Sequence, residues 1–497
     1  MKKLTDFPDV HLRIFDRPGL PDANQVSDVF LIGICGTGMG SLATLFADGG
    51  YTVSGSDKAA YPPMSETLAE LGITVREGFD AENLIPAPGL VIIGNACTPT
   101  HVEASFAREQ NMTQASFPEA LTHYFIRDRK SIVVAGTHGK TTTTSLLVHV
   151  FKSAGIDPGY LIGGVLSDGT PNTANGSADY FLVEGDEYDS AYFDKRPKFM
   201  HYRPSSAIVT SVEFDHADIY DSIDDCKAAF EEFAALLPAD GLLVLNADDD
   251  NAAELQYAGQ SRICLYSTSS ELLTGLSARN VSPSTNGIEF ELLRDGQPIG
   301  EFRLGMFGLH NLSNALAVAA IALDEDISVA HIQNAFAGFA GIQRRQEIIG
   351  EANGITVVDD FAHHPTAVRA TIKACRSRWP ERRIVAIFEP RSNSSRRKVF
   401  EDGYSKAFSE ADAAFMIRPP FRHNDRKSDF MDIDTILARL HQQGIEAQAA
   451  PDIDDLLTRL KIYLRSGDIA LIMSNGGFGN IHRRLLADLN QSSRTLG

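Results

Sequence analysis

The chain has 497 residues, which is too long for a single hydrophobic core, and a typical domain of about 150 residues predicts about three domains. Hydrophobic residues make up 43% and charged residues 22% of the chain, as in ordinary globular proteins. The net charge of −20, from 45 basic and 65 acidic side chains, argues against nonspecific binding to nucleic acid or to an anionic membrane.

The five cysteines are scattered, with no CxxC pair and no metal-ligand spacing. This pattern predicts reduced thiols in a cytoplasm. The N-terminal stretch MKKLTDFPDVHLRIFDRPGLPD lacks the apolar segment of a signal peptide. No run approaches the roughly 18 apolar residues that span a bilayer. We therefore expect a soluble, cytoplasmic protein.

The first segment opens with a buried strand, a glycine-rich turn, an amphipathic helix and a second strand, in DVFLIGICGTGMGSLATLFADGGYTVSGSD. This order predicts a βαβ unit. The strand–helix alternation continues to the charged stretch LTHYFIRDRK, which we interpret as a linker. The first predicted domain is Rossmann-like and covers 1–128.

The second segment, 129–342, begins with strand SIVVAG and helix KTTTTSLLVHVFKSAG and continues with strands ADYFLVEGDE, SSAIVTSVEFDH and GLLVLNADD. A hairpin is expected at Asp295-Gly296. The third segment, 343–497, repeats the alternation with strands ITVVDDFA, RRIVAIFEP, DAAFMIRP and DIALIMSN. The predicted fold is α/β with three consecutive domains: Rossmann-like, then a P-loop ATPase type with an added β-hairpin region, then Rossmann-like again.

The stretch VVAGTHGKTTTTSLL resembles a phosphate-binding loop of the form GxxxxGK[ST], but Val134 stands where the first glycine belongs and the first glycine is Gly136. The strand, tight loop and helix N-terminus that bind phosphate are nevertheless in the required order. Lys140 is expected to contact the β- and γ-phosphates, and Thr141 to bind Mg²⁺. The predicted ATP contacts in this loop are Gly136, Thr137, His138, Gly139, Lys140, Thr141 and Thr142.

Two acidic segments follow later strands, FLVEGDEYD with Glu184 and SVEFDHAD with His216. In doubly wound sheets ligands bind at the carboxyl ends of strands, so both segments should face the phosphates, where Mg²⁺ requires oxygen ligands. An Arg-Arg pair at the boundary of the third segment could supply a cation for the transferring phosphate.

The shortened GTHGKTTT, followed in order by FGLHNLSNALAVAAI, GIQRRQE and VDDFAHHP, resembles the Mur ligases, ATP-dependent amide-forming enzymes of bacterial cell-wall synthesis. The resemblance implies that Glu184 and Thr141 hold the magnesium of ATP and that His216 holds a second metal. It also implies three catalytic residues, Lys140, His216 and Arg345. It implies further ATP contacts from Asn311, Asn314, Arg345 and Asp360.

Many family members carry a carbamylated lysine about fifteen residues beyond this histidine, where the present chain has Glu231. The carbamate therefore remains unassigned. The chemistry follows from the fact that a carboxylate does not accept an amine directly. Phosphorylation by ATP gives an acyl phosphate, which an amine attacks with release of phosphate. Lys140, two Mg²⁺ ions and an arginine would stabilise the negative charge.

The loop GICGTGMG gives GxGxxS rather than the GxGxxG of dinucleotide-binding proteins and fits a nucleoside diphosphate as well as NAD. Resemblance to the ligases that take UDP-N-acetylmuramate implies a UDP-sugar site. Its predicted residues are Gly36, Thr37, Gly38, Met39, Ser56 and Asp57.

The triplet Arg391, Ser392 and Asn393 follows strand RRIVAIFEP and is expected to bind the carboxylates of a peptide amine substrate. The resemblance implies that the tripeptide L-Ala-γ-D-Glu-meso-diaminopimelate is joined to UDP-N-acetylmuramate, in cell-wall peptide recycling. L-Alanine as the amine remains an alternative. An NAD-dependent oxidoreductase would leave the GKT loop without a role, and a non-catalytic ATP switch would not need the first domain.

Overall fold

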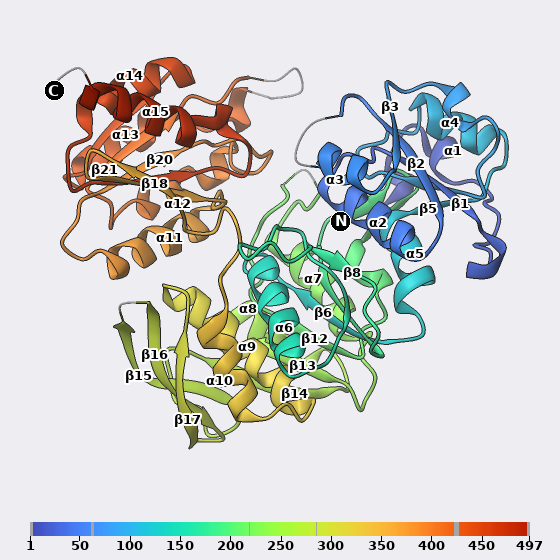
Figure 1. The fold of residues 1–497 in the computed structure, drawn as a ribbon, viewed down its shortest axis with the longest axis horizontal. Helices are drawn as coiled ribbons and strands as arrows, with labels where there is room; N and C mark the ends of the chain where they lie inside the picture. The colour runs from blue at the N-terminus through green and yellow to red at the C-terminus, as the bar shows by residue number, and fades with distance from the viewer. Residues whose placement is uncertain (1–2, 61–63, 218, 285, 422–426, 495–497) are drawn as a thin grey trace.

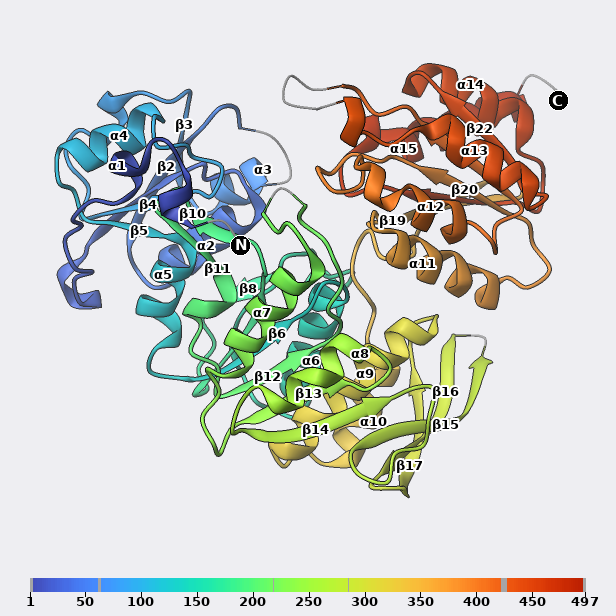
Figure 2. The same cartoon turned by 180° about the vertical axis from the view of Figure 1, so that it is seen from behind.

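The structure, a computed structural model, describes all residues except 1–2, 61–63, 218, 285, 422–426 and 495–497. The chain forms three α/β units, each built on its own sheet. The central unit lies between the other two, with the first and third units on opposite sides above it (Figures 1 and 2). Every described helix is too short or too polar to span a bilayer.

The first unit is a five-stranded parallel sheet in the order β3-β2-β1-β4-β5. The apolar strands β1 and β4 lie at its centre and are almost completely buried, as expected for a parallel sheet covered on both faces. Its strands are β1 (Asp28–Ile32), β2 (Thr52–Asp57), β3 (Thr74–Glu77), β4 (Leu90–Ile93) and β5 (Gln114–Ser116). Its helices are α1 (Val10–Arg13), α2 (Thr37–Asp48), α3 (Met64–Glu70), α4 (Val102–Glu109) and α5 (Phe117–Leu121).

The central unit has a ten-stranded sheet in the order β17-β16-β15-β14-β13-β12-β6-β9-β7-β8. Its strands are β6 (Lys130–Ala135), β7 (Gly159–Leu161), β8 (Thr173–Ala174), β9 (Tyr180–Gly185), β12 (Ser206–Val209), β13 (Leu242–Asn246), β14 (Arg262–Ser267), β15 (Leu276–Ser284), β16 (Gly287–Arg294) and β17 (Gln297–Leu304). Its helices are α6 (Lys140–Ser153), α7 (Ile223–Ala234), α8 (Asp250–Glu254), α9 (Leu309–Asp324) and α10 (Val329–Gly338).

The predicted hairpin is β16–β17, which turns at Asp295 and Gly296, both with positive φ (52° and 72°). Such dihedrals match the twist of a two-residue hairpin. With β15 this hairpin extends the parallel ATPase-type sheet by antiparallel strands.

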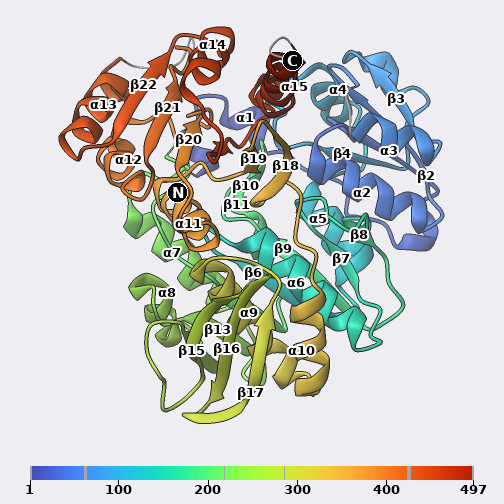
Figure 3. The same cartoon turned by 60° about the vertical axis from the view of Figure 1, so that its left-hand side comes forward.

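The third unit is a six-stranded sheet in the order β18-β19-β23-β20-β21-β22, parallel except for β18 (Figure 3). Its strands are β18 (Glu347–Ala352), β19 (Ile355–Asp360), β20 (Ile384–Phe388), β21 (Ala413–Ile417), β22 (Glu446–Ala450) and β23 (Ile469–Met473). Its helices are α11 (Pro365–Arg378), α12 (Glu401–Ala407), α13 (Ile433–Gln442), α14 (Ile453–Tyr463) and α15 (Ile481–Arg494). The three-domain α/β fold expected from the sequence is confirmed.

A short hairpin of the central unit, β10 (Asp189–Ala191) with β11 (Asp194–Pro197), inserts into the first unit. Its tip residues Tyr192 and Phe193 are buried in a core cluster with strands β1 and β4. The guanidinium of Arg17 lies 4.3 Å from the Phe193 ring centroid. The hairpin therefore fixes the first unit against the central sheet. The sequence did not predict this insertion.

Candidate active site

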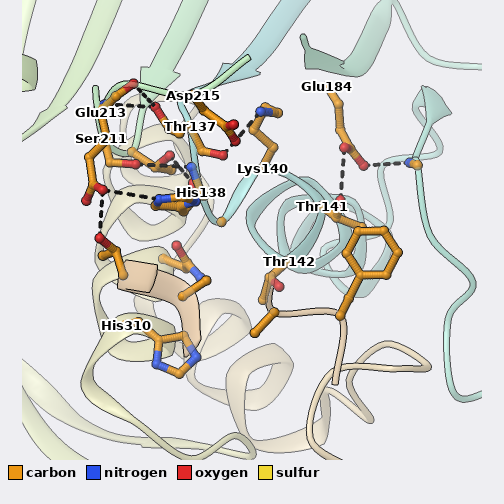
Figure 4. A pocket seen from close by; sticks show the side chains of 18 of the residues that line it. Thr137, His138, Lys140, Thr141, Thr142, Glu184, Ser211, Glu213, Asp215 and His310 are labelled. Atoms are coloured by element: carbon orange, nitrogen blue, oxygen red, sulfur yellow. Dashed lines mark hydrogen bonds and ion pairs between the residues drawn. The ribbon is translucent and has the colours of Figure 1, made fainter. Parts of the chain in front are cut away.

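A cavity of about 630 Å³ lies where the three units meet, at the carboxyl ends of the central parallel strands (Figure 4). It brings together most of the residues predicted for ATP and metal. The predicted residues in its wall are Thr37, Gly38, Thr137, His138, Gly139, Lys140, Thr141, Thr142, Glu184, His216, Asn311, Asn314, Arg345 and Asp360. Ligands of doubly wound sheets bind at this edge.

The phosphate cradle is the loop between β6 and α6, and two of its residues must be glycine. Gly139 has φ 81°, and a Cβ there would lie 2.6 Å from Asn314 Oδ1. Gly136 has φ 133°, and a Cβ would lie 2.1 Å from Thr210 Oγ1. The loop leads directly into the N-terminus of α6, whose dipole favours an anion. The missing first glycine therefore does not prevent the cradle from forming.

Lys140 is held by the loop and by a buried carboxylate. Its Nζ donates to Gly136 O (2.5 Å) and to Glu187 Oε2 (2.7 Å). Glu187 Oε1 lies 3.2 Å from His216 Nε2, so one carboxylate bridges two cationic groups. Although burial opposes it, the charge of Lys140 and the hydrogen bond to His216 lower the pKa of Glu187 to about 2. Burial of the His216 ring favours its neutral form, but the hydrogen bond to Glu187 outweighs burial and raises the pKa of His216 to about 9.

Glu184 and Thr141 form the pair expected to hold magnesium. Thr141 Oγ1 donates to Glu184 Oε2 (3.0 Å), and the amide of Gly163 donates to Glu184 Oε1 (2.6 Å). Burial, assisted by the charge of Asp186, raises the pKa of Glu184 to about 7. A cation bound here would stabilise the carboxylate, so the oxygen-rich pair fits Mg²⁺.

The opposite wall comes from α9 and the third unit. Asn311 and Asn314 are buried on α9, and Asn311 Nδ2 donates to Phe307 O (2.8 Å). Asp360, at the end of β19, accepts hydrogen bonds from the amides of Gln346 (2.9 Å) and Ala362 (2.7 Å). Asn311, Asn314 and Asp360 line the cavity beside the cradle.

Arg345 also lines the cavity, with its guanidinium 5.1 Å from the Phe361 ring centroid. Burial of the His310 ring and the nearby charge of Arg345 lower the pKa of His310 to about 4. His310 lines the same wall and is neutral at pH 7.

The first unit reaches the cavity through the start of α2 and through α5, by Thr37, Gly38 and Phe117. Gly36 is the N-cap residue of α2, and Met39 is buried within that helix. Asp57 Oδ2 accepts from the amide of Cys35 in the glycine-rich turn (2.8 Å). Ser56 is buried, and its hydroxyl donates to Glu103 Oε2 (2.6 Å). The carbonyl oxygen of Ser56 accepts from the amides of Gly33 (2.8 Å) and Ile34 (3.0 Å), so Ser56 and Asp57 both hold the loop, but neither lines the cavity.

Arg391 lies in a second cavity, of about 980 Å³, at the carboxyl edge of the third sheet. Arg344 and Arg483 also line this cavity, together with the carboxylates of Glu347 and Asp359, and Arg344 Nε lies 3.1 Å from Asp359 Oδ2. Ser392 and Asn393 stabilise the turn after β20. Ser392 Oγ accepts from the amide of Ser395 (2.9 Å), and Asn393 Oδ1 accepts from Arg396 (3.3 Å). The three residues predicted for the peptide are adjacent, but Arg391 alone of them lines either cavity.

Several charged residues of the cavity wall were not predicted from the sequence, among them Glu187 and Lys198. Glu187 belongs to the same FLVEGDEYD segment as Glu184, and that segment was the only available signal. Lys198 follows the β10–β11 hairpin and is 9% exposed. Its Nζ lies 3.2 Å from Asp186 Oδ2 and 3.1 Å from the Tyr188 hydroxyl. A buried cation therefore faces the cavity between the cradle and Phe117 of the first unit.

Fold and cavity together define an enzyme that uses a nucleoside triphosphate between three α/β units. Family models match along the chain: the Mur ligase family catalytic domain over 28–129, the Mur ligase middle domain over 134–322, and the Mur ligase glutamate ligase domain over 344–476. The chain belongs to the Mur ligase family and is an ATP-dependent ligase.

Among its relatives is the UDP-N-acetylmuramate–L-alanyl-γ-D-glutamyl-meso-2,6-diaminoheptandioate ligase of Escherichia coli, 38% identical over 93% of this chain and 98% of the relative. The UDP-N-acetylmuramate–L-alanine ligase of a Geobacter species is 33% identical over 95% of this chain and 99% of the relative. The crystal structure of a murein peptide ligase from Psychrobacter arcticus is similar with TM-score 0.71 and 34% identity, covering 93% of this chain and 99% of that one.

Proposed function

We propose that the protein uses ATP to join L-Ala-γ-D-Glu-meso-diaminopimelate to UDP-N-acetylmuramate, in the recycling of cell-wall peptide. The single observation that carries this is the cavity shared by all three units, which has a phosphate cradle at its centre and a second cavity, lined by Arg391, beside it in the third unit. The relatives named for this reaction match nearly the whole chain. Five free cysteines and the use of ATP favour a cytoplasmic location.

Each unit has a separate task in this proposal. The first, 1–128, binds the UDP-sugar through the loop Gly36–Met39, with Ser56 and Asp57 beneath it. The second, 129–342, binds ATP in the cradle, with Asn311 and Asn314 on the adenine side. The third, 343–497, supplies Arg345 to the phosphates and Asp360 to the ribose, and binds the amine substrate.

The reaction needs charge stabilisation more than covalent chemistry by the protein. A carboxylate oxygen of the acceptor attacks the γ-phosphorus of ATP, and ADP leaves. The peptide amine then attacks the carbonyl carbon of the acyl phosphate, and inorganic phosphate leaves. Lys140 and Arg345 would stabilise the transferring phosphoryl group. Two Mg²⁺ ions, one held by Thr141 with Glu184 and one by His216 after loss of its proton, would supply Lewis-acid stabilisation.

Lys198 is the best-placed cation for the acceptor's carboxylate. The UDP end of the acceptor belongs to the first unit, which reaches the cavity at Gly38 and Phe117, and Lys198 Nζ lies 4.9 Å from the Phe117 ring centroid. A buried ammonium attracts a carboxylate more strongly than an exposed one, because less water screens the pair. The β10–β11 hairpin positions this lysine and the first unit together.

Amine specificity is assigned to the cavity around Arg391. Gly476 leaves room for this side chain, since a Cβ there would lie 1.9 Å from Arg391 Nη1. A tripeptide carries carboxylates far from its attacking amine, whereas L-alanine carries one close by. An arginine can bind such a carboxylate with two parallel hydrogen bonds, which lysine cannot reproduce.

The proposal is tested by measuring phosphate release with UDP-N-acetylmuramate and either amine. The tripeptide should support turnover and L-alanine should not. Arg391→Lys should raise the tripeptide KM roughly ten- to a hundredfold, for a lost charged hydrogen bond of about 1.5–3 kcal/mol, with little effect on the KM for ATP. Wild-type protein that couples ATP to L-alanine and ignores the tripeptide would instead support the alanine ligase alternative.

A further inference from the structure

Three potential metal ligands from distant parts of the sequence meet at the boundary between the central and third units. His138 belongs to the cradle loop, Glu213 follows β12, and His364 is the N-cap residue of α11. One donor atom of each residue lies within 4.8 Å of the donor atoms of the other two. Figure 4 shows the ion pair of His138 and Glu213 on the side of the cradle away from Glu184.

The spacing of these donor atoms suits a tetrahedral ion. Glu213 Oε2 lies 3.5 Å from His138 Nε2 and 3.5 Å from His364 Nδ1. Metal–ligand bonds of about 2.0–2.2 Å at tetrahedral angles separate neighbouring donor atoms by roughly 3.4 Å. Two of the three distances between donor atoms are therefore already close to those of a tetrahedral site. The distances are too long for good hydrogen bonds, which are usually about 2.7–3.2 Å.

Each of the two imidazole rings has a ring nitrogen without a hydrogen-bond partner. The Nε2 atoms of His138 and His364 are buried without a hydrogen-bond partner, which is uncommon in folded proteins. His364 Nδ1 accepts one long bond from the amide of Thr366 (3.3 Å), which a metal would replace. Thr366 Oγ1 donates to Glu213 Oε2 (2.7 Å) and orients the carboxylate, as outer-shell partners of metal ligands do.

Apolar packing holds the pieces in place. Phe214, next to Glu213, stacks on Phe400 of the third unit at 6.1 Å between ring centroids. The ring of His364 packs edge-on against the same Phe400 at 5.1 Å. The site is thus assembled by contacts that do not depend on a metal.

We propose that His138, Glu213 and His364 form a binding site for one transition-metal ion of the Zn²⁺ type, which ties the cradle loop to the third unit. Two imidazoles with one carboxylate are the donors of open zinc sites, whereas a site with two nitrogen donors out of three is unusual for Mg²⁺, which binds mainly through oxygen. The site is distinct from the Thr141–Glu184 pair, and it stands whether or not the proposed substrates are correct. The fourth position is left for water or a ligand in the cavity.

The test uses the full-length protein, stripped of metal with a chelator and titrated with Co²⁺ in excess Mg²⁺, which occupies the oxygen-rich sites. We expect the strong visible d–d absorption of four-coordinate cobalt, saturating at one ion per chain and abolished by one equivalent of Zn²⁺. His364→Asn and Glu213→Gln should each weaken Co²⁺ binding at least tenfold.

These substitutions preserve the fold, because asparagine is a good N-cap for α11 and glutamine can still accept the bond from Thr366. His331→Asn is the matched control, since His331 is exposed on α10, and it should not change the titration. Lys140→Ala should also bind Co²⁺ normally, which separates this site from ATP binding. The proposal would be overturned if the d–d absorption band of cobalt did not appear, or if folded His364→Asn protein bound Co²⁺ with wild-type affinity. A cobalt–thiolate charge-transfer band would also overturn it.

Discussion

Replacing Glu187 by glutamine removes the charge between Lys140 and His216 while keeping the side chain's size. Glu187 is 4% exposed and contacts both groups, at 2.7 Å and 3.2 Å. In the variant two cationic groups would lie side by side in a buried place without a counter-charge. We expect the cradle region to be destabilised and phosphate release to fall.

The size of the effect follows from the pKa of the carboxyl group, which falls from 4.5 to about 2 in the folded protein. At about 1.4 kcal/mol per pH unit, this is roughly 3 kcal/mol in favour of the ionised form. Loss of one partner of a buried pair typically costs about 3–5 kcal/mol. Because the folded pKa is lowered, the stabilisation is complete above about pH 4.5 and is lost as the pH falls toward 2. The variant should therefore differ fully from wild type at pH 7.

Hydrogen exchange monitored by mass spectrometry measures this locally. Peptides covering 130–153 should lose protection equivalent to roughly 3 kcal/mol in Glu187→Gln, while peptides covering 347–388 of the third unit serve as the internal control. In a double-mutant cycle with Lys140→Met, the two losses should be less than additive by roughly 2 kcal/mol, because each variant removes the same pair. Additive losses, within about 0.5 kcal/mol, would refute the bridging role of Glu187.

Three further predictions concern the ligands. Lys140→Ala should abolish phosphate release while UDP-N-acetylmuramate still binds, measured by calorimetry; loss of that binding in folded protein would contradict the assignment of the first unit. Glu184→Gln and His216→Ala should each lower turnover and shift the Mg²⁺ titration to higher concentration, because each loses a metal ligand; an unchanged titration in both would refute the metal placement. Lys198→Met should raise the KM for UDP-N-acetylmuramate roughly tenfold or more. The control is Lys195→Met in the neighbouring β10–β11 hairpin, where Lys195 pairs with Asp189, and it should leave this KM unchanged. Equal effects of the two substitutions would indicate a loosened hairpin instead.

The sequence alone determined the three α/β units and the position of the cradle. Both depend on local order: apolar strands followed by glycine turns and helices, and a Gly-Lys-Thr at the start of a helix. Gly136 and Gly139 do have the backbone angles and close contacts that require glycine. The resemblance to the Mur ligases implied the pairing of Thr141 with Glu184, and the fold allows it because β6 and β9 are parallel neighbours that end at one edge of the sheet.

Only the tertiary structure decided which charges share a buried space. Glu187 lies between Lys140 and His216, and Lys198 reaches the cavity, because the β10–β11 hairpin packs its aromatic tip into the first unit. The contact of Glu213 with His364 joins residues 151 positions apart, at a distance that depends on how Phe214 packs against the third unit. Such contacts follow from side-chain packing between units. Spacing along the chain carries no information about that packing, because the hydrophobic pattern fixes which face of an element is buried but not which partner covers it.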